Sequence, residues 1–396
     1  MVVFLRRCAL LLCGVLALTA CSPAPTAPVG HAVLPDLPAG AATWSPWPSA
    51  LHDARHSGAS PAAGPTSGRI RWQRNLGDAV APGPVIGKDG TIYVATNAGI
   101  LHAIDPATGT DRWTYDSHTS QPGADLSVSP LVLPNGNILF PTPGTSLVAL
   151  SPAGHELWQQ NLPGRPTSPV TTNGTRVYVG DQSGSVTAID LTGAPTVAWT
   201  IDTGAASYAS VVTNGTGAVY TTSGTSLVAI TDHGTSASIA WRADPHDGDT
   251  EVSPGLAPDG TILLGTNGSQ EWAYRPDGSA AWHSPRVITY SSPSVTATDL
   301  AYVGDHTGTV HVLDTATGTE SGSYRVTKTQ IWSSTVVDRD YRVYFGGQNG
   351  HVYGVSPGGA VLFDVDLGAP IDSYPALTGT GMLVVGATNG TFAAIS

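Results

Sequence analysis

The stretch Thr91–Trp113, T-I-Y-V-A-T-N-A-G-I-L-H-A-I-D-P-A-T-G-T-D-R-W, contains the unit that the rest of the chain repeats. Residues 92–94 and 100–104 are short apolar runs rich in β-branched residues, which predict two strands joined by an N-A-G turn. The D-P-A-T-G segment predicts a second tight turn before a third strand that carries Trp113. Such a unit cannot bury both of its faces alone, so copies of it must stack.

Copies of this unit recur along most of the chain. A Ser-Pro-like pair precedes a run of small and β-branched residues eight times, and its second residue is Pro84, Pro130, Pro169, Ser210, Pro254, Pro293, Ser334 or Pro375. These positions are 46, 39, 41, 44, 39, 41 and 41 residues apart. A period in the forties with several strands per repeat is typical of propeller blades. The sequence therefore predicts an all-β, eight-bladed β-propeller of four-stranded antiparallel blades.

The two ends of the repeat array complement each other. The last repeat stops at Ser396 after its third strand, while an additional strand, R-I-R-W-Q-R-N-L at 69–76, precedes the first repeat. If the strand at 69–76 completes the last blade, the ring closes and no sheet edge is left bare. We therefore expect a closed ring in which the strand 69–76 pairs with the end of the chain.

The repeat resembles the pyrroloquinoline-quinone (PQQ)-like β-propeller repeat family. The family pattern Ala-x-Asp-x-x-Thr-Gly-x-x-x-Trp is matched by Ala103, Asp105, Thr108, Gly109 and Trp113. In that family the tryptophan is wedged between neighbouring blades. The resemblance therefore implies a blade-docking role for the tryptophans of the predicted outer strands: Trp72, Trp113, Trp158, Trp199, Trp241 and Trp282.

Residues 1–20 have the pattern of an export signal. Arg6 and Arg7 form a charged start, and 10–18 is an apolar run too short to span a bilayer. The sequence Leu18-Thr-Ala-Cys21 resembles the bacterial lipobox, so we expect cleavage before Cys21 and its modification with fatty acyl chains such as palmitate. Two or three chains anchor a protein stably to a membrane. The alternative is an ordinary secretory signal with a chance cysteine.

The mature chain divides into three parts. Residues 21–43 are rich in Pro and Ala and predict an extended tether. Residues 44–68 contain Trp44 and Trp47, so we expect this segment to dock on the propeller, which spans 69–396. His52 and His56 have the spacing of two metal ligands on a helix, but the surrounding prolines disfavour a helix.

Composition limits the partners. Loss of Arg6 and Arg7 with the signal leaves 15 Lys and Arg against 29 Asp and Glu, a formal net charge of −14. An acidic surface repels phosphate backbones, so nucleic acid is excluded as an expected partner. The three cysteines are Cys8, Cys13 and Cys21, so the mature chain has no free thiol for a disulfide, a metal site or a nucleophile.

We expect ligands at the axial mouth, where the loops that enter the innermost strands converge. These loops carry residues larger than Ser or Thr: Asp125, Arg165, Tyr208, Glu251, Tyr290, Trp332, Asp372 and Tyr374. Aromatic rings with carboxylates and one arginine suit a glycan, a peptide or a loop of a protein partner. The alternative is that some of these side chains only fill the funnel.

Chemistry-bearing motifs are sparse. The sequence has no G-x-S-x-G, Walker, G-x-G-x-x-G or H-E-x-x-H pattern. The most acidic stretch, 243–251, offers Asp244, Asp247, Asp249 and Glu251 as oxygen ligands for Ca²⁺, although the spacing is not that of an EF-hand. The alternative is a solvated acidic turn, and no catalytic residue or metal site is assigned.

The resemblance implies two classes of function. One branch of the family is the quinoprotein dehydrogenases, which bind PQQ with Ca²⁺ at the propeller axis, often against a disulfide of adjacent cysteines that this chain cannot form. The other is non-catalytic and includes BamB-like lipoproteins of the outer membrane. We expect a lipid-anchored, monomeric, extracytoplasmic scaffold in the cell envelope, without a cofactor, that binds a protein partner or ligand. A PQQ-dependent dehydrogenase or a surface polysaccharide-binding module are the alternatives.

Overall fold

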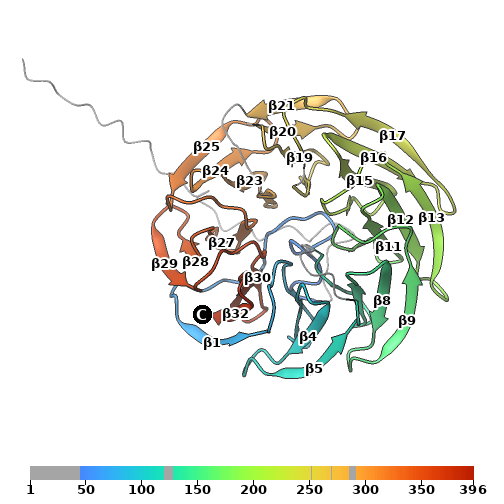
Figure 1. Ribbon diagram of the computed structural model, residues 1–396. Helices are drawn as coiled ribbons and strands as arrows, with labels where there is room; N and C mark the ends of the chain where they lie inside the picture. The colour runs from blue at the N-terminus through green and yellow to red at the C-terminus, as the bar shows by residue number, and fades with distance from the viewer. Residues whose placement is uncertain (1–44, 120–127, 251, 269, 285–290) are drawn as a thin grey trace, which may run out of the picture.

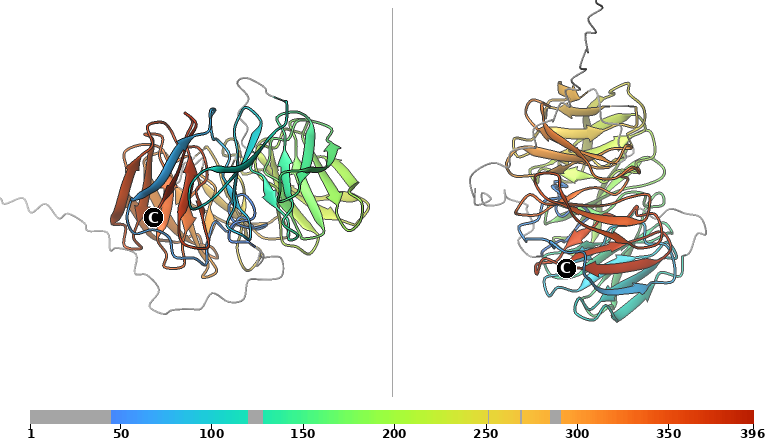
Figure 2. Two further views of the ribbon diagram at one scale, coloured as in Figure 1. Left: turned by 90° about the horizontal axis from the view of Figure 1, so that it is seen from below. Right: turned by 90° about the vertical axis from the view of Figure 1, so that its left-hand side faces the viewer.

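The computed structural model describes residues 45–119, 128–250, 252–268, 270–284 and 291–396. These residues form 32 strands and no helix. The strands make eight four-stranded antiparallel sheets that stand around a common axis (Figure 1, Figure 2). The predicted all-β, eight-bladed propeller is confirmed.

Each blade runs from the axis outward. The innermost strands have two residues each: β2 (Val85–Ile86), β6 (Leu131–Val132), β10 (Thr171–Thr172), β14 (Val212–Thr213), β18 (Gly255–Leu256), β22 (Ser294–Val295), β26 (Val336–Val337) and β30 (Ala376–Leu377). The second strands are β3 (Ile92–Ala95), β7 (Ile138–Pro141), β11 (Arg176–Gly180), β15 (Ala218–Ser223), β19 (Ile262–Gly265), β23 (Leu300–Gly304), β27 (Val343–Gly346) and β31 (Leu383–Gly386). Both rows are almost wholly buried, because a neighbouring blade covers each face.

The outer half of each blade is longer. The third strands are β4 (Ile100–Ile104), β8 (Ser146–Leu150), β12 (Ser185–Asp190), β16 (Ser226–Asp232), β20 (Glu271–Tyr274), β24 (Thr309–Asp314), β28 (His351–Val355) and β32 (Thr391–Ile395). The outer strands are β5 (Asp111–Asp116), β9 (Glu156–Asn161), β13 (Thr196–Asp202), β17 (Ala237–Ala243), β21 (Ala280–Ser284), β25 (Glu320–Arg325), β29 (Val361–Asp366) and β1 (Ile70–Asn75). Exposed residues alternate with partly buried ones along these outer strands, as expected for a sheet with one solvated edge.

The ring closes where the prediction placed the closure. β1 pairs with β32, with Trp72 opposite Ala394 and Asn75 opposite Thr391. β1 (blue) and β32 (red) therefore lie side by side although they come from opposite ends of the chain (Figure 1). The strand is one residue shorter at each end than the predicted 69–76, because the flanking backbone groups bond just outside the ladder: Leu76 N donates to Gly390 O, and Ser396 N to Arg69 O.

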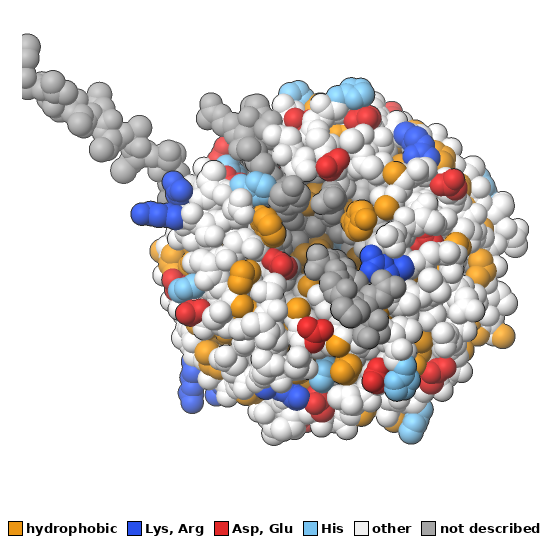
Figure 3. All heavy atoms as spheres, in the orientation of Figure 1, with side chains coloured by type: hydrophobic (Ala, Val, Ile, Leu, Met, Phe, Trp, Pro, Cys, Tyr) orange, Lys and Arg blue, Asp and Glu red, His pale blue; other side chains and the backbone are white. Residues whose placement is uncertain are grey.

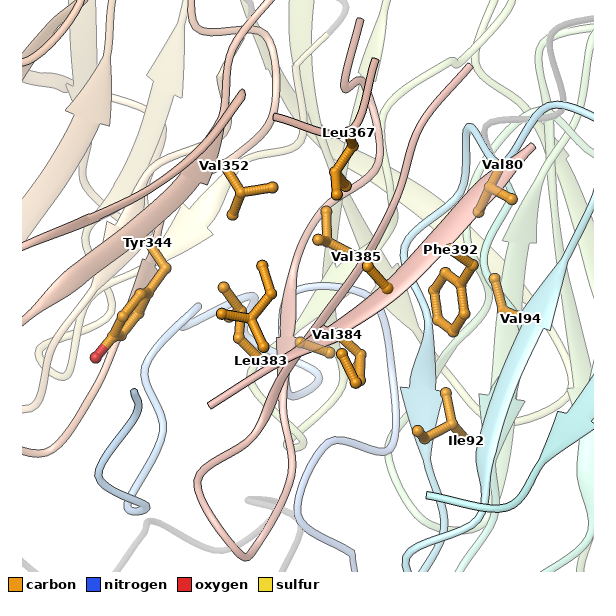
Figure 4. Close-up of a cluster of buried hydrophobic side chains, with 14 of the residues drawn as sticks. Val80, Ile92, Val94, Tyr344, Val352, Leu367, Leu383, Val384, Val385 and Phe392 are labelled. Carbon is orange, nitrogen blue, oxygen red and sulfur yellow. The ribbon is translucent and has the colours of Figure 1, made fainter. Parts of the chain in front are cut away.

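Apolar side chains pack between the blades rather than within them. At the closure, Leu383, Val384, Val385 and Phe392 of the last blade fill the space between Tyr344 and Val352 on one side and Ile92 and Val94 on the other (Figure 4). All eight are buried. Full burial of one such side chain contributes about 1.5–3 kcal/mol. The last blade is thus held by both neighbours, although one of its strands comes from the start of the chain.

The outer-strand tryptophans contact the turn of the following blade. The indole Nε1 of Trp72, Trp113 and Trp241 donates to the carbonyl oxygens of Pro106, Pro152 and Pro276, at 2.8–2.9 Å. Trp282 reaches Thr315 O at 2.8 Å, Trp199 reaches Asp232 Oδ1 at 3.0 Å, and Trp158 packs on the apolar cluster between the second and third blades. In the sixth blade the register position of the tryptophan is Gly322, and Tyr324, two residues later, contacts the next blade instead.

Serines link the blades around the axis. Ser210 N donates to Ser253 Oγ at 2.9 Å, Ser253 N to Ser292 Oγ at 3.0 Å, and Ser292 N to Ser334 Oγ at 3.0 Å. Each serine lies two residues before the inner strand of its blade, and each bond joins it to the equivalent serine of the next blade. The recurrent serine of the sequence repeat therefore ties the inner ends of consecutive blades together.

Candidate functional site

The ring has two different axial ends. The inner strands begin at one face and end at the opposite face, so residues that precede them surround the first end, which we call the open mouth. Figure 3 shows this face, which is hollowed at its centre. The opposite end is filled by residues 45–60, which we call the axial segment; it is the blue chain that crosses the middle of the ring behind the blades in Figure 1. A ligand that binds in the hollow must therefore enter from the open mouth.

Two aromatic side chains are exposed at the open mouth. Tyr208 and Trp332 each lie four residues before an inner strand, and 47% and 38% of their surfaces are exposed. The equivalent residue of the third blade, Thr167, is buried and donates to Ser207 O at 2.6 Å. Large exposed aromatic side chains in a hollow are characteristic of binding surfaces.

Polar groups of three predicted residues lie at the same end. Asp372 also lies four residues before an inner strand, and its Oδ1 accepts a hydrogen bond from Gln348 Nε2 at 2.5 Å. Tyr374, two residues further on, packs against Gly83 of the first blade. Burial of the Tyr374 hydroxyl and the nearby Asp372 charge raise its pKa to about 12. The phenol therefore stays protonated and can donate a hydrogen bond.

Arg165, the third of these residues, approaches the mouth from the third blade. Its backbone carbonyl accepts a hydrogen bond from Gln182 N at 2.8 Å, which fixes the loop, and its side chain is half-buried. The buried Nε has no hydrogen-bond partner among the residues that the structure describes. The Nε is therefore an unsatisfied buried donor, while the side chain as a whole is partly exposed at the mouth. Asp125, Glu251 and Tyr290 lie outside the described residues.

The acidic stretch forms ordinary loop hydrogen bonds. Asp244 Oδ1 accepts from His246 N at 2.7 Å and Oδ2 from Thr225 at 2.9 Å, while Asp247 Oδ2 accepts from Thr266 at 2.7 Å. Asp249 N donates to Asn267 Oδ1 at 2.8 Å. Within the described residues no three His, Cys, Asp or Glu side chains gather as metal ligands would. The fourth ligand candidate, Glu251, lies outside them.

No site for a quinone with Ca²⁺ is assigned in the described part of the axis. No three His, Cys, Asp or Glu side chains come together there as ligands for the ion. The axis is lined by small serines, and its far end is filled by residues 45–60. No catalytic step is therefore assigned to the quinone.

Glu271 is a feature that sequence reasoning missed. The other blades have an apolar residue in this third-strand position: Leu101, Leu147, Val186, Leu227, Val310, Val352 and Phe392. Glu271 is 0% exposed, and in the described part of the chain neither carboxyl oxygen has a hydrogen-bond partner. Burial raises its pKa to about 8. A register alignment of the third strands would have revealed the exception.

The axial segment was expected to dock, but its place was not foreseen. Its carbonyl oxygens accept hydrogen bonds from the inner strands, so it lies on the axis rather than on the outer surface. His52 and His56 lie on irregular chain with positive φ of 83° and 55°, not on a helix. Within the described residues, no helix has the length and apolar character needed to cross a membrane.

Three proteins of known sequence are similar to parts of this chain or to most of it. A quinohemoprotein alcohol dehydrogenase of Comamonas testosteroni is 32% identical over 120 residues, but this match covers 28% of the chain and only 17% of that enzyme. The outer membrane protein assembly factor BamB of Nitrosomonas eutropha is 32% identical over 91 residues, 23% of the chain and 21% of that protein. Protein Rv3035 of Mycobacterium tuberculosis is 23% identical across 85% of the chain and 89% of that protein.

Solved structures share the fold. BamB of Moraxella catarrhalis has a TM-score of 0.67 at 14% identity, covering 82% of this chain and 98% of that one. The Comamonas testosteroni enzyme has a TM-score of 0.69 at 16% identity, covering 89% and 81%. The family model described as "Outer membrane protein assembly factor BamB" matches residues 61–132, 119–239 and 145–396. The chain therefore belongs to this family of PQQ-like repeat propellers.

Proposed function

We propose that this protein is a lipid-anchored, extracytoplasmic scaffold without catalytic activity, which binds a protein partner of the cell envelope at its open mouth. Family membership and the lipobox-like sequence before Cys21 support an envelope location. Residues 45–60 occupy the axis at the far end of the closed ring, so the open mouth is the axial face that the chain's own segment does not fill.

The observation that carries this proposal is the exposure of Tyr208 and Trp332 at equivalent positions of two blades. Aromatic side chains of this kind provide most of the affinity of an interface when a partner buries them. Around them, Arg165 and Asp372 are half-buried and bring opposite charges to the mouth. This combination orients a polypeptide loop by polar contacts and holds it by aromatic ones.

The experiment compares matched surface variants of the purified full-length chain. Immobilised wild type and a Tyr208→Ala, Trp332→Ala double variant are incubated with detergent extract of the native envelope, and the captured proteins are quantified by mass spectrometry. We expect the specific partner to decrease at least about tenfold in the double variant, since two aromatic anchors are lost. Leu157→Ala is the control, because Leu157 is 49% exposed on the outer strand β9, away from the mouth.

Other outcomes would replace this proposal. An equal loss of partner in the Leu157→Ala control would move the binding surface away from the mouth. Reduction of an artificial electron acceptor by the protein with PQQ, Ca²⁺ and an alcohol or sugar would show a dehydrogenase. Retention of the wild type, but not of the double variant, on a cell-wall glycan column would identify the mouth as a polysaccharide site.

A further inference from the structure

The axial segment is bound as an extended peptide is bound at a sheet edge. The second residue of six inner strands donates its backbone N–H to a carbonyl oxygen of the segment, at 2.7–3.0 Å. The pairs are Ile86 to Trp47, Val132 to Pro48, Thr213 to Ala54, Leu256 to Arg55, Val295 to Ser57 and Val337 to Gly58. Because these amides are the free edges of six different blades, one short peptide satisfies donors around most of the ring.

A single aromatic anchor accompanies these main-chain bonds. Trp47 is 1% exposed, packs in the apolar cluster with Ile86 and Leu377, and lies 4.9 Å from the His52 ring. Ser45 Oγ donates to the carbonyl of Ile86, so both backbone groups of this residue bond to the segment. Main-chain hydrogen bonds plus a side-chain pocket are the features by which sheet edges recognise peptides.

The ring does not need the segment for its own sheets. All eight four-stranded blades, including the closure of β1 on β32, are formed by residues 70–396. The connection between the segment and β1 runs along the seventh blade, where Gly64 N donates to Asp338 Oδ2 at 2.8 Å and Tyr344 OH to Pro65 O at 3.0 Å. The next two residues, 66 and 67, are exposed. The segment can therefore leave the axis while the closed ring remains.

The segment also carries features that weaken its own binding. Leu51, His52 and His56 have φ values of 52°, 83° and 55°, a backbone conformation that is unfavourable for residues other than glycine. His56 is 0% exposed, and neither ring nitrogen has a hydrogen-bond partner within the described ranges. Strained residues and an unsatisfied buried imidazole oppose binding and are unsuited to a permanent filling.

We propose that the inner-strand edges at this axial end form a peptide-binding site. In the structure this site holds the chain's own residues 45–60. The same segment of a second copy of the chain can replace them while the ring stays closed. We name a second copy as the source of the incoming peptide because it carries the same residues that occupy the site in the structure, with the same Trp47 and the same backbone pattern. This site is separate from the open mouth and does not depend on the proposed function.

Native-state hydrogen exchange on the unmodified chain tests the release step. We expect the amides of Leu256, Val295 and Val337, which bond to the segment, to exchange through a common partial opening. This exchange should be at least about tenfold faster than that of ladder amides of the same blades, such as Leu264 and Val312, which require global unfolding. Exchange of both groups at the same rate, with the same denaturant dependence, would overturn the proposal.

Cross-linking tests the exchange itself. Ala59 forms a parallel bridge with Val337, so a cysteine on each can form a disulfide. A fluorescent peptide of residues 45–60 with Ala59→Cys is incubated with the full chain carrying Val337→Cys and with Cys8, Cys13 and Cys21 replaced by serine. We expect covalent labelling of the folded chain, reduced at least about tenfold when the peptide also carries Trp47→Ala.

The control is a chain with both Ala59→Cys and Val337→Cys, oxidised before the peptide is added, in which the segment is locked in place. This chain presents the same ring but no free site, so it should not be labelled. A peptide of scrambled sequence gives the background labelling of the Val337→Cys chain. If the peptide of residues 45–60 labels this chain no more than the scrambled peptide does, the exchange is contradicted. The hydrogen-exchange result stands independently if Val337→Cys impairs folding.

Discussion

The indole of Trp72 lies directly on Gly109, and its Nε1 donates to the carbonyl oxygen of Pro106 at 2.8 Å. Trp72 belongs to β1, at the start of the chain, whereas Gly109 is in the turn before β5 of the first blade. The same contact recurs inside the ring, where Trp113, Trp241 and Trp282 lie on Gly154, Gly278 and Gly318. The seam between the chain ends is therefore held by the same contact as the joints between consecutive blades.

Gly109→Ala should destabilise the fold. A Cβ at this position would lie 2.6 Å from Cδ2 of Trp72, and Gly109 has a φ of 73°. We expect a loss of about 2–4 kcal/mol in the free energy of unfolding, from overpacking and backbone strain together. Gly204→Ala, after the outer strand of the third blade, is the matched control, because Gly204 has a φ of 95° and no atom lies within 4 Å of its added Cβ. Equal effects of the two substitutions on urea unfolding would contradict a docking role for Trp72.

Most of the fold could be predicted because every repeat shows the same pattern of strands and turns. The period near 41 residues, the aromatic outer strands and the strand around Trp72 gave the blade number and the closure, both of which are confirmed. The same redundancy hid the exceptions. In the sixth blade Gly322 holds the register position of Trp113, and the aromatic side chain is Tyr324, two residues later on the same face of the strand.

The candidate site was less predictable than the fold. The positions of Tyr208, Trp332 and Asp372 follow from the repeat, because residues at one repeat position must surround the axis at one height. The path of residues 45–60 cannot be predicted from the repeat. It depends on main-chain hydrogen bonds, such as the one from Val295 N to Ser57 O, and these leave no pattern of side chains in the sequence. The isolation of Glu271 also depends on tertiary packing, which composition and periodicity do not report.

Cys21→Ser should release the protein from the membrane. The sequence before Cys21 predicts cleavage and acylation at this residue. Two acyl chains hold a protein stably on a bilayer, and a protein without acyl chains lacks this anchor. We expect the wild type in the carbonate-washed membrane fraction with the mass of an acylated amino terminus, and the variant in the soluble fraction. If both proteins stay in the membrane fraction and the mass of the wild type shows no acyl group, the assignment of Cys21 as the lipid anchor is wrong.

Asp232→Asn should weaken the joint between the third and fourth blades. The Asp232 side chain is 3% exposed and accepts hydrogen bonds from Arg176 at 2.6 and 2.7 Å, from Tyr178 at 2.9 Å and from Trp199 at 3.0 Å. Loss of its charge leaves the Arg176 guanidinium, itself largely shielded from solvent, with a weaker partner. We expect unfolding to become easier by about 2–4 kcal/mol at pH 7.

The effect of Asp232→Asn should depend on pH in a defined direction. Burial opposes the Asp232 charge, but the hydrogen bonds from Arg176, Gly234, Trp199 and Tyr178 outweigh it and lower the pKa of this carboxyl. A lowered folded-state pKa gives stability that is present above about pH 4 and is lost as pH falls through the folded value. The wild type should therefore approach the variant in acid. Asp202→Asn, at an exposed carboxylate on the outer strand of the third blade, should change stability by less than about 0.5 kcal/mol at either pH.

Glu271→Leu should stabilise the protein. The carboxyl is fully buried and has no partner among the described residues, and the other seven blades place an apolar side chain in the same register position. Replacement by leucine removes an unsatisfied polar group and adds apolar contact between the fifth and sixth blades, so we expect a gain of about 1–4 kcal/mol near pH 7. Thermal and urea unfolding of the full chain measure this gain. A loss of stability would show that the carboxyl has a structural role.

The stability of the wild type should also fall as pH rises. Burial raises the Glu271 pKa from 4.5 to about 8, so the folded state retains a proton that the unfolded state has released between these values. Over this window the contribution of Glu271 to the free energy of unfolding decreases by up to about 1.4 kcal/mol per pH unit, and it levels off above about pH 8. Glu271→Gln separates charge from polarity: it should abolish this slope, as leucine does, without the full gain in stability. If the free energy of unfolding falls with pH equally steeply in both variants and in the wild type, another group causes the pH dependence, and the buried Glu271 carboxyl does not.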